Sequence, residues 1–198
     1  VTGDTGKYLF GNPRLGDEKY VIGKIDHYFS SATTLFGNYS YDDTDLSVMD
    51  NYGLKSITSP SRRINGILSL QHVFSPTLIS TTRFGISRTF AYNNLDSNPT
   101  TPLLADKSLG FYPGLNVGVF TISGINGAFV GIGGGFGTSG INMFGNTNPQ
   151  TAEDISWTRG RHSMRFGFNH ERFIYNLTSG NRVNGEYAFA GVSDFLQG

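Results

Sequence analysis

The chain has 198 residues, of which only 15% are charged while 14% are aromatic and 27 are glycine. Its 15 basic and 15 acidic residues cancel, so no net positive field attracts nucleic acid, and we expect no nucleic-acid partner. Cysteine is absent, which excludes disulfides, thiolate nucleophiles and cysteine-based metal sites.

Alternation of apolar and polar residues is the main structural signal, and it recurs along the chain. In residues 20–29, Val21 and Ile25 share one side while Lys24 and Asp26 take the other, as in a strand with two different faces. Similar segments follow in pairs, each pair reading as a hairpin. The expected strands cover residues 20–29, 34–42, 63–74, 78–92, 151–159, 162–175 and 185–191.

The connections between these strands alternate in length. Short links are expected near residues 30–33, 75–77 and 159–161. Long ones are expected at residues 43–61, 93–149 and 176–184. Short turns at one end and long loops at the other are typical of an antiparallel, up-and-down outer-membrane β-barrel, whose short turns are periplasmic and whose long loops are extracellular.

A soluble β-sandwich is the alternative, because alternating strands also build sandwiches. Two observations favour the membrane. The polar sides carry charges, as a wet lumen permits, and aromatic residues gather toward the strand ends, where they suit the two lipid headgroup levels. Those aromatic residues are Tyr28, Phe29 and Phe74 near the short turns, and Tyr39, Tyr41, Phe90, Tyr92 and Tyr175 toward the long loops.

Three hairpin segments resemble those of TonB-dependent receptors, most closely the Oar-like group, whose members usually carry an N-terminal carboxypeptidase-regulatory-like domain. They are KIDHYFSSATTLFGNYSYDD (residues 24–43), HVFSPTLISTTRFGISR (72–88) and ISWTRGRHSMRFGFNHER (155–172). The closing GEYAFAGVSDFLQG (185–198) is similar to the segment that follows such strands in that group. The resemblance implies a barrel of about 22 strands with a plugged lumen in the outer membrane of a Gram-negative bacterium.

Within that family, the whole of residues 1–198 is expected to be an internal part of one barrel domain, contributing six or seven strands. Neither the plug nor the TonB box is found in it. The resemblance implies energised uptake of a large solute, with outer-membrane lipid and, through the missing N-terminal part, the TonB complex as partners. A passive outer-membrane pore or structural barrel and a soluble sandwich adhesin remain the alternatives. The residues do not identify the solute.

Several motifs suggest chemistry without supporting it. GFGTSG (residues 135–140) matches the dinucleotide pattern G-x-G-x-x-G, but no helical period follows it and the next acidic residues come too early. Asp42, Asp43, Asp45 and Asp50 lack the spacing of a calcium loop, so a solvated loop is preferred. No nucleophile elbow or pair of catalytic carboxylates is present. We therefore expect no enzyme activity, no catalytic residues, no cofactor and no metal.

The long loop at residues 93–149 is the expected place of solute contact, because its aromatic residues are set among glycines. Stacking or apolar contacts with the solute are one hypothesis, and packing of the loop on itself is the alternative. The candidate residues are Phe111, Tyr112, Phe120, Phe129, Phe136 and Phe144.

Overall fold

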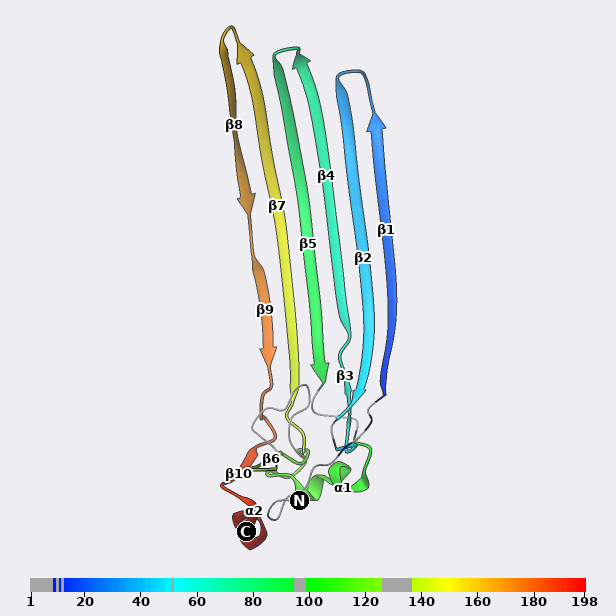
Figure 1. Cartoon of the computed structure of the whole chain (residues 1–198), viewed down its shortest axis with the longest axis vertical. Coiled ribbons are helices and arrows are strands. Elements are labelled where there is room, and N and C mark those ends of the chain that lie inside the picture. The colour runs from blue at the N-terminus through cyan, green and yellow to red at the C-terminus, as the bar shows by residue number, and fades with distance from the viewer. Residues whose placement is uncertain (1–8, 10, 12, 51, 95–98, 126–136) are drawn as a thin grey trace.

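The computed structural model describes residues 9, 11, 13–50, 52–94, 99–125 and 137–198. Long antiparallel strands stand side by side and form one sheet, with the loops gathered at one end (Figure 1). The strands of this sheet are β1 (Arg14–Tyr28), β2 (Thr33–Met49), β3 (Ser56–Thr58), β4 (Ser61–Ser75), β5 (Leu78–Asn94), β7 (Ile141–Arg159), β8 (His162–Glu171) and β9 (Ile174–Ser179).

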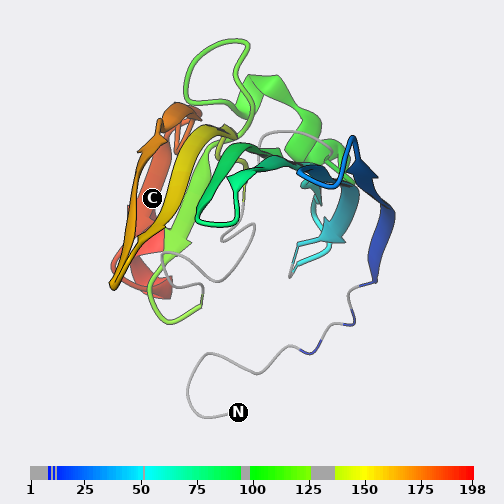
Figure 2. The ribbon, with the colours of Figure 1, turned by 90° about the horizontal axis from the view of Figure 1, so that it is seen from above.

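The sheet is a meander in which each long strand pairs with its neighbour in sequence. The long strands follow the order β1-β2-β4-β5-β7, and β8 and β9 both pair with β7, one after the other along its length. Strand β3 is a three-residue addition that bridges β2 and β5 at the loop end. Seen from above, the sheet is an open arc with β1 and β8 at opposite edges (Figure 2). A single open sheet of this kind contradicts the sandwich alternative, which needs two packed sheets.

The short connections all lie at the end of the sheet opposite the loops (Figure 1). They cover residues 29–32, 76–77 and 160–161. Gly160, the first residue of the last turn, has a φ of 59°, which an L side chain rarely adopts but which a two-residue hairpin requires there. The expected short turns are thus confirmed. The expected long loops at residues 43–61 and 176–184 are shorter than predicted, because β2 continues to Met49, β3 occupies Ser56–Thr58 and β9 continues to Ser179.

Several strands are longer than the sequence pattern predicts. Strand β2 continues to Met49, and β7 begins at Ile141, ten residues before the expected start. The loop between β5 and β7 therefore covers residues 95–140 rather than 93–149. The prediction was wrong here because Gly145 and Pro149 interrupt the apolar pattern, although the register with β5 continues through both.

Pro149 explains why the last wall strand is divided into β8 and β9. The backbone carbonyl of Pro149 accepts a hydrogen bond from the Arg172 amide at 3.1 Å. The reverse bond, from residue 149 to the Arg172 carbonyl, is missing because proline has no backbone N–H. The pairing register with β7 is the same before and after this point, from Gln150–Glu171 to Thr147–Ile174. One missing donor therefore interrupts the ladder without shifting it.

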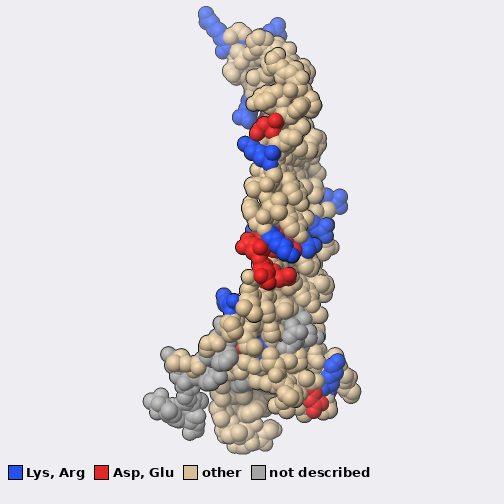
Figure 3. Space-filling model, turned by 90° about the vertical axis from the view of Figure 1, so that its right-hand side faces the viewer, with Lys and Arg blue, Asp and Glu red and all other residues tan. Residues whose placement is uncertain are grey.

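Cross-strand partners share a face of the sheet, so the register defines two unlike faces. The apolar face carries rows such as Ile25, Gly37, Leu68 and Phe84. The polar face carries rows such as Ser40, Asn65, Ser87 and Asn148. Charged residues gather at a few levels along the sheet, with uncharged surface between them (Figure 3).

Buried apolar residues lie at the loop end rather than along the wall. They are Val48, Ile57, Leu104, Val117, Val119 and Ile122. Here α1 (Pro102–Ala105), the 3₁₀ turn η1 (Lys107–Leu109), β6 (Val119–Ile122), β10 (Glu186–Phe189) and α2 (Val192–Gln197) form a small unit that we call the loop cap. It comprises residues 50, 52–60, 99–125, 137–140 and 180–198.

The seventh expected strand does not join the wall. Residues 186–189 form β10, which pairs in parallel with β6 inside the loop cap, so this segment ties two loops together. Its alternation is real, but alternation alone does not say which sheet a strand joins. Within the part of the chain that the structure describes, no helix is long and apolar enough to cross a membrane.

Candidate functional site in the loop cap

The loop cap contains an apolar pocket of about 480 Å³ that is partly open to its surroundings. Its lining comes from distant parts of the chain, including Leu54, Leu104, Val117, Phe120 and Phe195. Thr101 supplies the only polar side chain among the described lining residues, and none of them is charged. Such a cavity accepts an apolar or aromatic group and offers nothing to hold an ion.

Two buried charged residues, Asp50 and Lys55, support the cap next to Gly137, which lines this cavity. Asp50 and Lys55 are only 2% and 3% exposed. The Asp50 carboxylate accepts hydrogen bonds from the amides of Leu54, at 2.7 Å, and Lys55, at 3.3 Å. The Lys55 ammonium donates to the carbonyl of Gly137. Burial lowers the pKa of Lys55, and the nearby Asp50 charge partly opposes this.

A second polar contact joins three loops. The Thr138 hydroxyl donates to the Val117 carbonyl at 2.7 Å and accepts from the Asn184 side-chain amide at 2.9 Å. The Thr138 amide donates to the same carbonyl at 2.8 Å. Residues from before β6, before β7 and before β10 are therefore held together by hydrogen bonds within buried surroundings. The loops behave as one folded unit with its own small core.

Four aromatic residues of the cap form a connected group. Phe120 stacks on Tyr187 with ring centroids 5.0 Å apart and an angle of 15° between the planes. Phe111 meets Tyr187 edge-on at 5.6 Å and Tyr112 at 5.0 Å. Phe111 and Tyr112 remain 51% and 61% exposed, so the group ends at solvent. These are favourable aromatic geometries.

Only some of the predicted contact residues lie together in the loop cap. Phe111, Tyr112 and Phe120 do come together in the cap, and Phe120 also lines the cavity. Phe144 was wrongly assigned to the loop, because it lies in β7 opposite Ala91 of β5. Phe129 and Phe136 lie outside the described residues. Tyr187 was missed, since its segment reads as a wall strand and no local signal reveals its partner Phe120.

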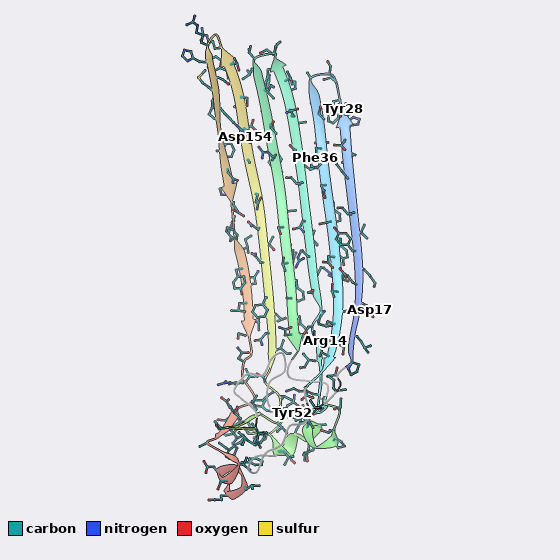
Figure 4. All side chains as sticks on the ribbon, in the orientation of Figure 1. Arg14, Asp17, Tyr28, Phe36, Tyr52 and Asp154 are labelled. Carbon is teal, nitrogen blue, oxygen red and sulfur yellow. The ribbon has the colours of Figure 1, made fainter. Side chains whose placement is uncertain are left out.

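The polar face of the wall carries hydrogen-bonded charges. Asp154 contacts Arg83 and, at 3.3 Å, Arg165, so one carboxylate joins β5, β7 and β8. Asp154 is labelled near the short-turn end of β7 in Figure 4. Glu171 accepts from the amides of Asn148 at 2.5 Å and Gln150 at 2.9 Å. This face suits a water-filled interior.

Glu153 is the neighbour of Asp154 and points to the opposite, apolar face, as expected for successive strand residues. Its carboxylate accepts hydrogen bonds from the hydroxyls of Ser80 and Thr82, which satisfy its oxygens. The two carboxylates therefore do not form a catalytic pair, because the sheet lies between them.

The misleading motifs have structural settings of their own. Gly140, the last residue of the dinucleotide-like pattern, is followed directly by β7 rather than by a helix, so no helix N-terminus faces a phosphate. In β2, Asp43 and Asp45 share one face while Asp42 lies on the other, and Asp50 is buried in the loop cap. Over the described ranges no three His, Asp or Glu residues gather in a way that could hold a metal ion.

One comparison with known proteins gives a match. A family model described as an outer membrane beta barrel domain matches residues 1–198. No curated protein and no solved structure matches the chain.

Proposed function

The chain belongs to the outer-membrane β-barrel domain family, and from this premise we propose that it is part of the barrel of a TonB-dependent receptor for a large solute. Family membership places the wall in the outer membrane of a Gram-negative bacterium. The apolar face then meets lipid, and the polar face, with Asp154 and its two arginines, lines the lumen.

The observation that carries the proposal is the loop cap. Loops of a simple structural barrel need no common core, yet here distant loops are joined by the Lys55–Gly137 contact and by the β6–β10 pairing. The cap holds an apolar cavity and exposed aromatic residues at the extracellular end of a polar lumen. Specificity of a barrel transporter lies in such loops, because its lipid-facing wall cannot discriminate solutes.

The choice of a TonB-dependent receptor over a passive pore rests on the hairpin segments that resemble that group, residues 24–43, 72–88 and 155–172. The proposal includes contact with the TonB complex through an N-terminal part of the protein and no catalytic role. The cavity lining favours a solute with an apolar or aromatic group, since the described lining residues carry no charge to bind an anion or cation.

Solute uptake by the full-length receptor tests the proposal. The variant Phe111→Ala/Tyr112→Ala removes the exposed end of the aromatic group, and we expect uptake at low solute concentration to fall about tenfold, as the loss of two aromatic contacts implies. Phe74→Ala is the matched control, because Phe74 is 63% exposed but lies at the short-turn end.

Uptake is also measured in cells without TonB. The receptor hypothesis requires that uptake is then abolished for the wild-type protein. Uptake that persists without TonB supports the passive pore instead. Equal uptake by the aromatic variant and the control variant would show that the cap does not contribute to solute recognition.

A further inference from the structure

A groove of about 600 Å³ crosses the apolar face of the wall. Glycines form its floor in three adjacent strands: Gly23 in β1, Gly37 in β2 and Gly66 in β4. Gly37 lies between its partners Ile25 and Leu68, and Gly66 lies between Tyr39 and Ile86. The missing side chains leave a hollow between apolar walls.

The groove is open to the membrane rather than to water. Its walls, which include Leu68, Phe84 and Ile86, belong to the face that family membership turns toward lipid. Leu68 and Phe84 are 51% and 56% exposed, so no part of the described chain covers them. On a lipid-facing wall such a hollow is in contact with acyl chains rather than with water.

A single arginine lies beside the groove on the same face. Arg88 follows Ile86 by two residues in β5, toward the loop end, and has Ile64 and Thr147 as cross-strand partners. Its side chain is exposed. Within the described residues it forms no ion pair or hydrogen bond, whereas Arg62, farther along the same face, is held by Asp43 at 3.0 Å.

The depth of Arg88 is that of the lipid headgroups. Tyr41 is the partner of Ile64, and Ile64 is the partner of Arg88, so the three share one cross-strand row. Interfacial tyrosines occupy this level in membrane barrels. At this level an arginine is tolerated on a lipid-facing wall, and a lipid phosphate matches the fork of donors of its guanidinium.

We propose that this surface binds a phosphate-bearing lipid of the outer leaflet, with its phosphate on Arg88 and one acyl chain in the glycine-floored groove. The charge and the hollow are adjacent and match the two parts of such a molecule. The site rests on family membership and on the wall geometry, so it is independent of TonB and of the transported solute.

Retention of lipid by the purified full-length receptor tests this site. Gly23→Leu/Gly66→Val fills the groove, since a Cβ at Gly23 meets nothing within 4 Å and one at Gly66 meets Ile86 Cγ2 at an ordinary 3.5 Å. Arg88→Gln removes the charge without altering the groove. Gly145→Val is the control, because Gly145 is also on the apolar face and its Cβ would meet Asn176 at 3.7 Å.

Native mass spectrometry counts the lipid that stays bound after detergent exchange, and heat-modifiable migration on gels confirms that each variant is folded. We expect both site variants to retain about tenfold less phosphorylated lipid than the wild type and the Gly145 variant. Phosphatidylglycerol added back should bind to the wild type, and diacylglycerol with the same chains should bind far less. Equal retention by all four proteins, or equal binding of the two added lipids, overturns the proposal.

Discussion

Lys55 is an unusual residue to bury, because removing an ammonium from water is costly unless partners compensate. It has two: the Asp50 charge and the Gly137 carbonyl. The pKa of Lys55 is lowered below its ordinary value of 10.5, mainly by burial. The folded cap therefore releases the lysine proton at a lower pH than the unfolded loops do.

This shift makes cap stability depend on pH in a defined direction. Between the lowered pKa of folded Lys55 and 10.5, the unfolded loops bind more protons, so the contribution of Lys55 to stability increases as pH rises through this window. Limited proteolysis of the cap in the full-length barrel should thus slow between neutral and alkaline pH. In Lys55→Met this dependence should disappear, and a variant that keeps it would show that another group is responsible.

Gly137 is required for a different reason. Its φ is +87°, and a Cβ there would lie 1.8 Å from the Gly118 carbonyl oxygen, so a side chain forces the backbone apart. Gly124 has nearly the same φ, +86°, with nothing within 4 Å. Gly124→Ala should cost only the conformational strain of about 1 kcal/mol. Gly137→Ala should cost at least about 2 kcal/mol more, because backbone has to move.

Hydrogen exchange of the cap amides measures this difference in local opening free energy. Gly124→Ala serves as the control for the φ requirement alone. Equal protection in the two variants would mean that the close approach of Gly137 to Gly118 is easily relieved.

At the scale of the element, the division between β8 and β9 follows from one proline in the neighbouring strand. The N and O of Pro149 face β8, where the Arg172 amide donates to its carbonyl. Toward β5, Pro149 opposes Ile86 at a position where the backbone groups point away, so the proline costs no hydrogen bond there. A proline is therefore tolerated in an interior strand at the expense of continuity in the next one.

Restoring the donor should join the two strands. In Pro149→Thr the new amide can donate to the Arg172 carbonyl, and we expect a local gain of about 1 kcal/mol, the typical net contribution of one hydrogen bond. Hydrogen exchange of the amides of residues 172–174 should slow about fivefold. The control Thr147→Val, in the same strand, should leave the exchange of these amides unchanged. If exchange is also unaltered in Pro149→Thr, the division between β8 and β9 has another cause.

At the scale of the whole molecule, the wall has neither closed edges nor a core of its own. Strand β1 is exposed along its full length, and β8 and β9 lie at the other edge. Large apolar side chains such as Ile25 and Leu68 remain more than half exposed. A sheet with unpaired edges and an apolar face tends to associate rather than to stay monomeric.

The isolated 198-residue chain should consequently not fold as a monomer in water. We expect the isolated chain to aggregate without detergent. Backbone amides of the strands should be protected from hydrogen exchange only when the chain is part of the complete barrel in detergent or lipid. Analytical ultracentrifugation and NMR provide the measurement. A sharp, dispersed spectrum from a monomer in plain buffer would contradict the prediction.

The sequence by itself determined the wall of this protein, because side-chain alternation and turn residues are local properties. The sequence alone places Ile25, Leu68 and Phe84 on the apolar sides of their own strands and predicts the turn at Gly160. Only the tertiary structure decided what the loops build. Asp50, Lys55 and Gly137 meet across more than 80 residues, Tyr187 finds Phe120, and three glycines align into one groove. Such contacts depend on strand register and chain reversal, which no local pattern encodes.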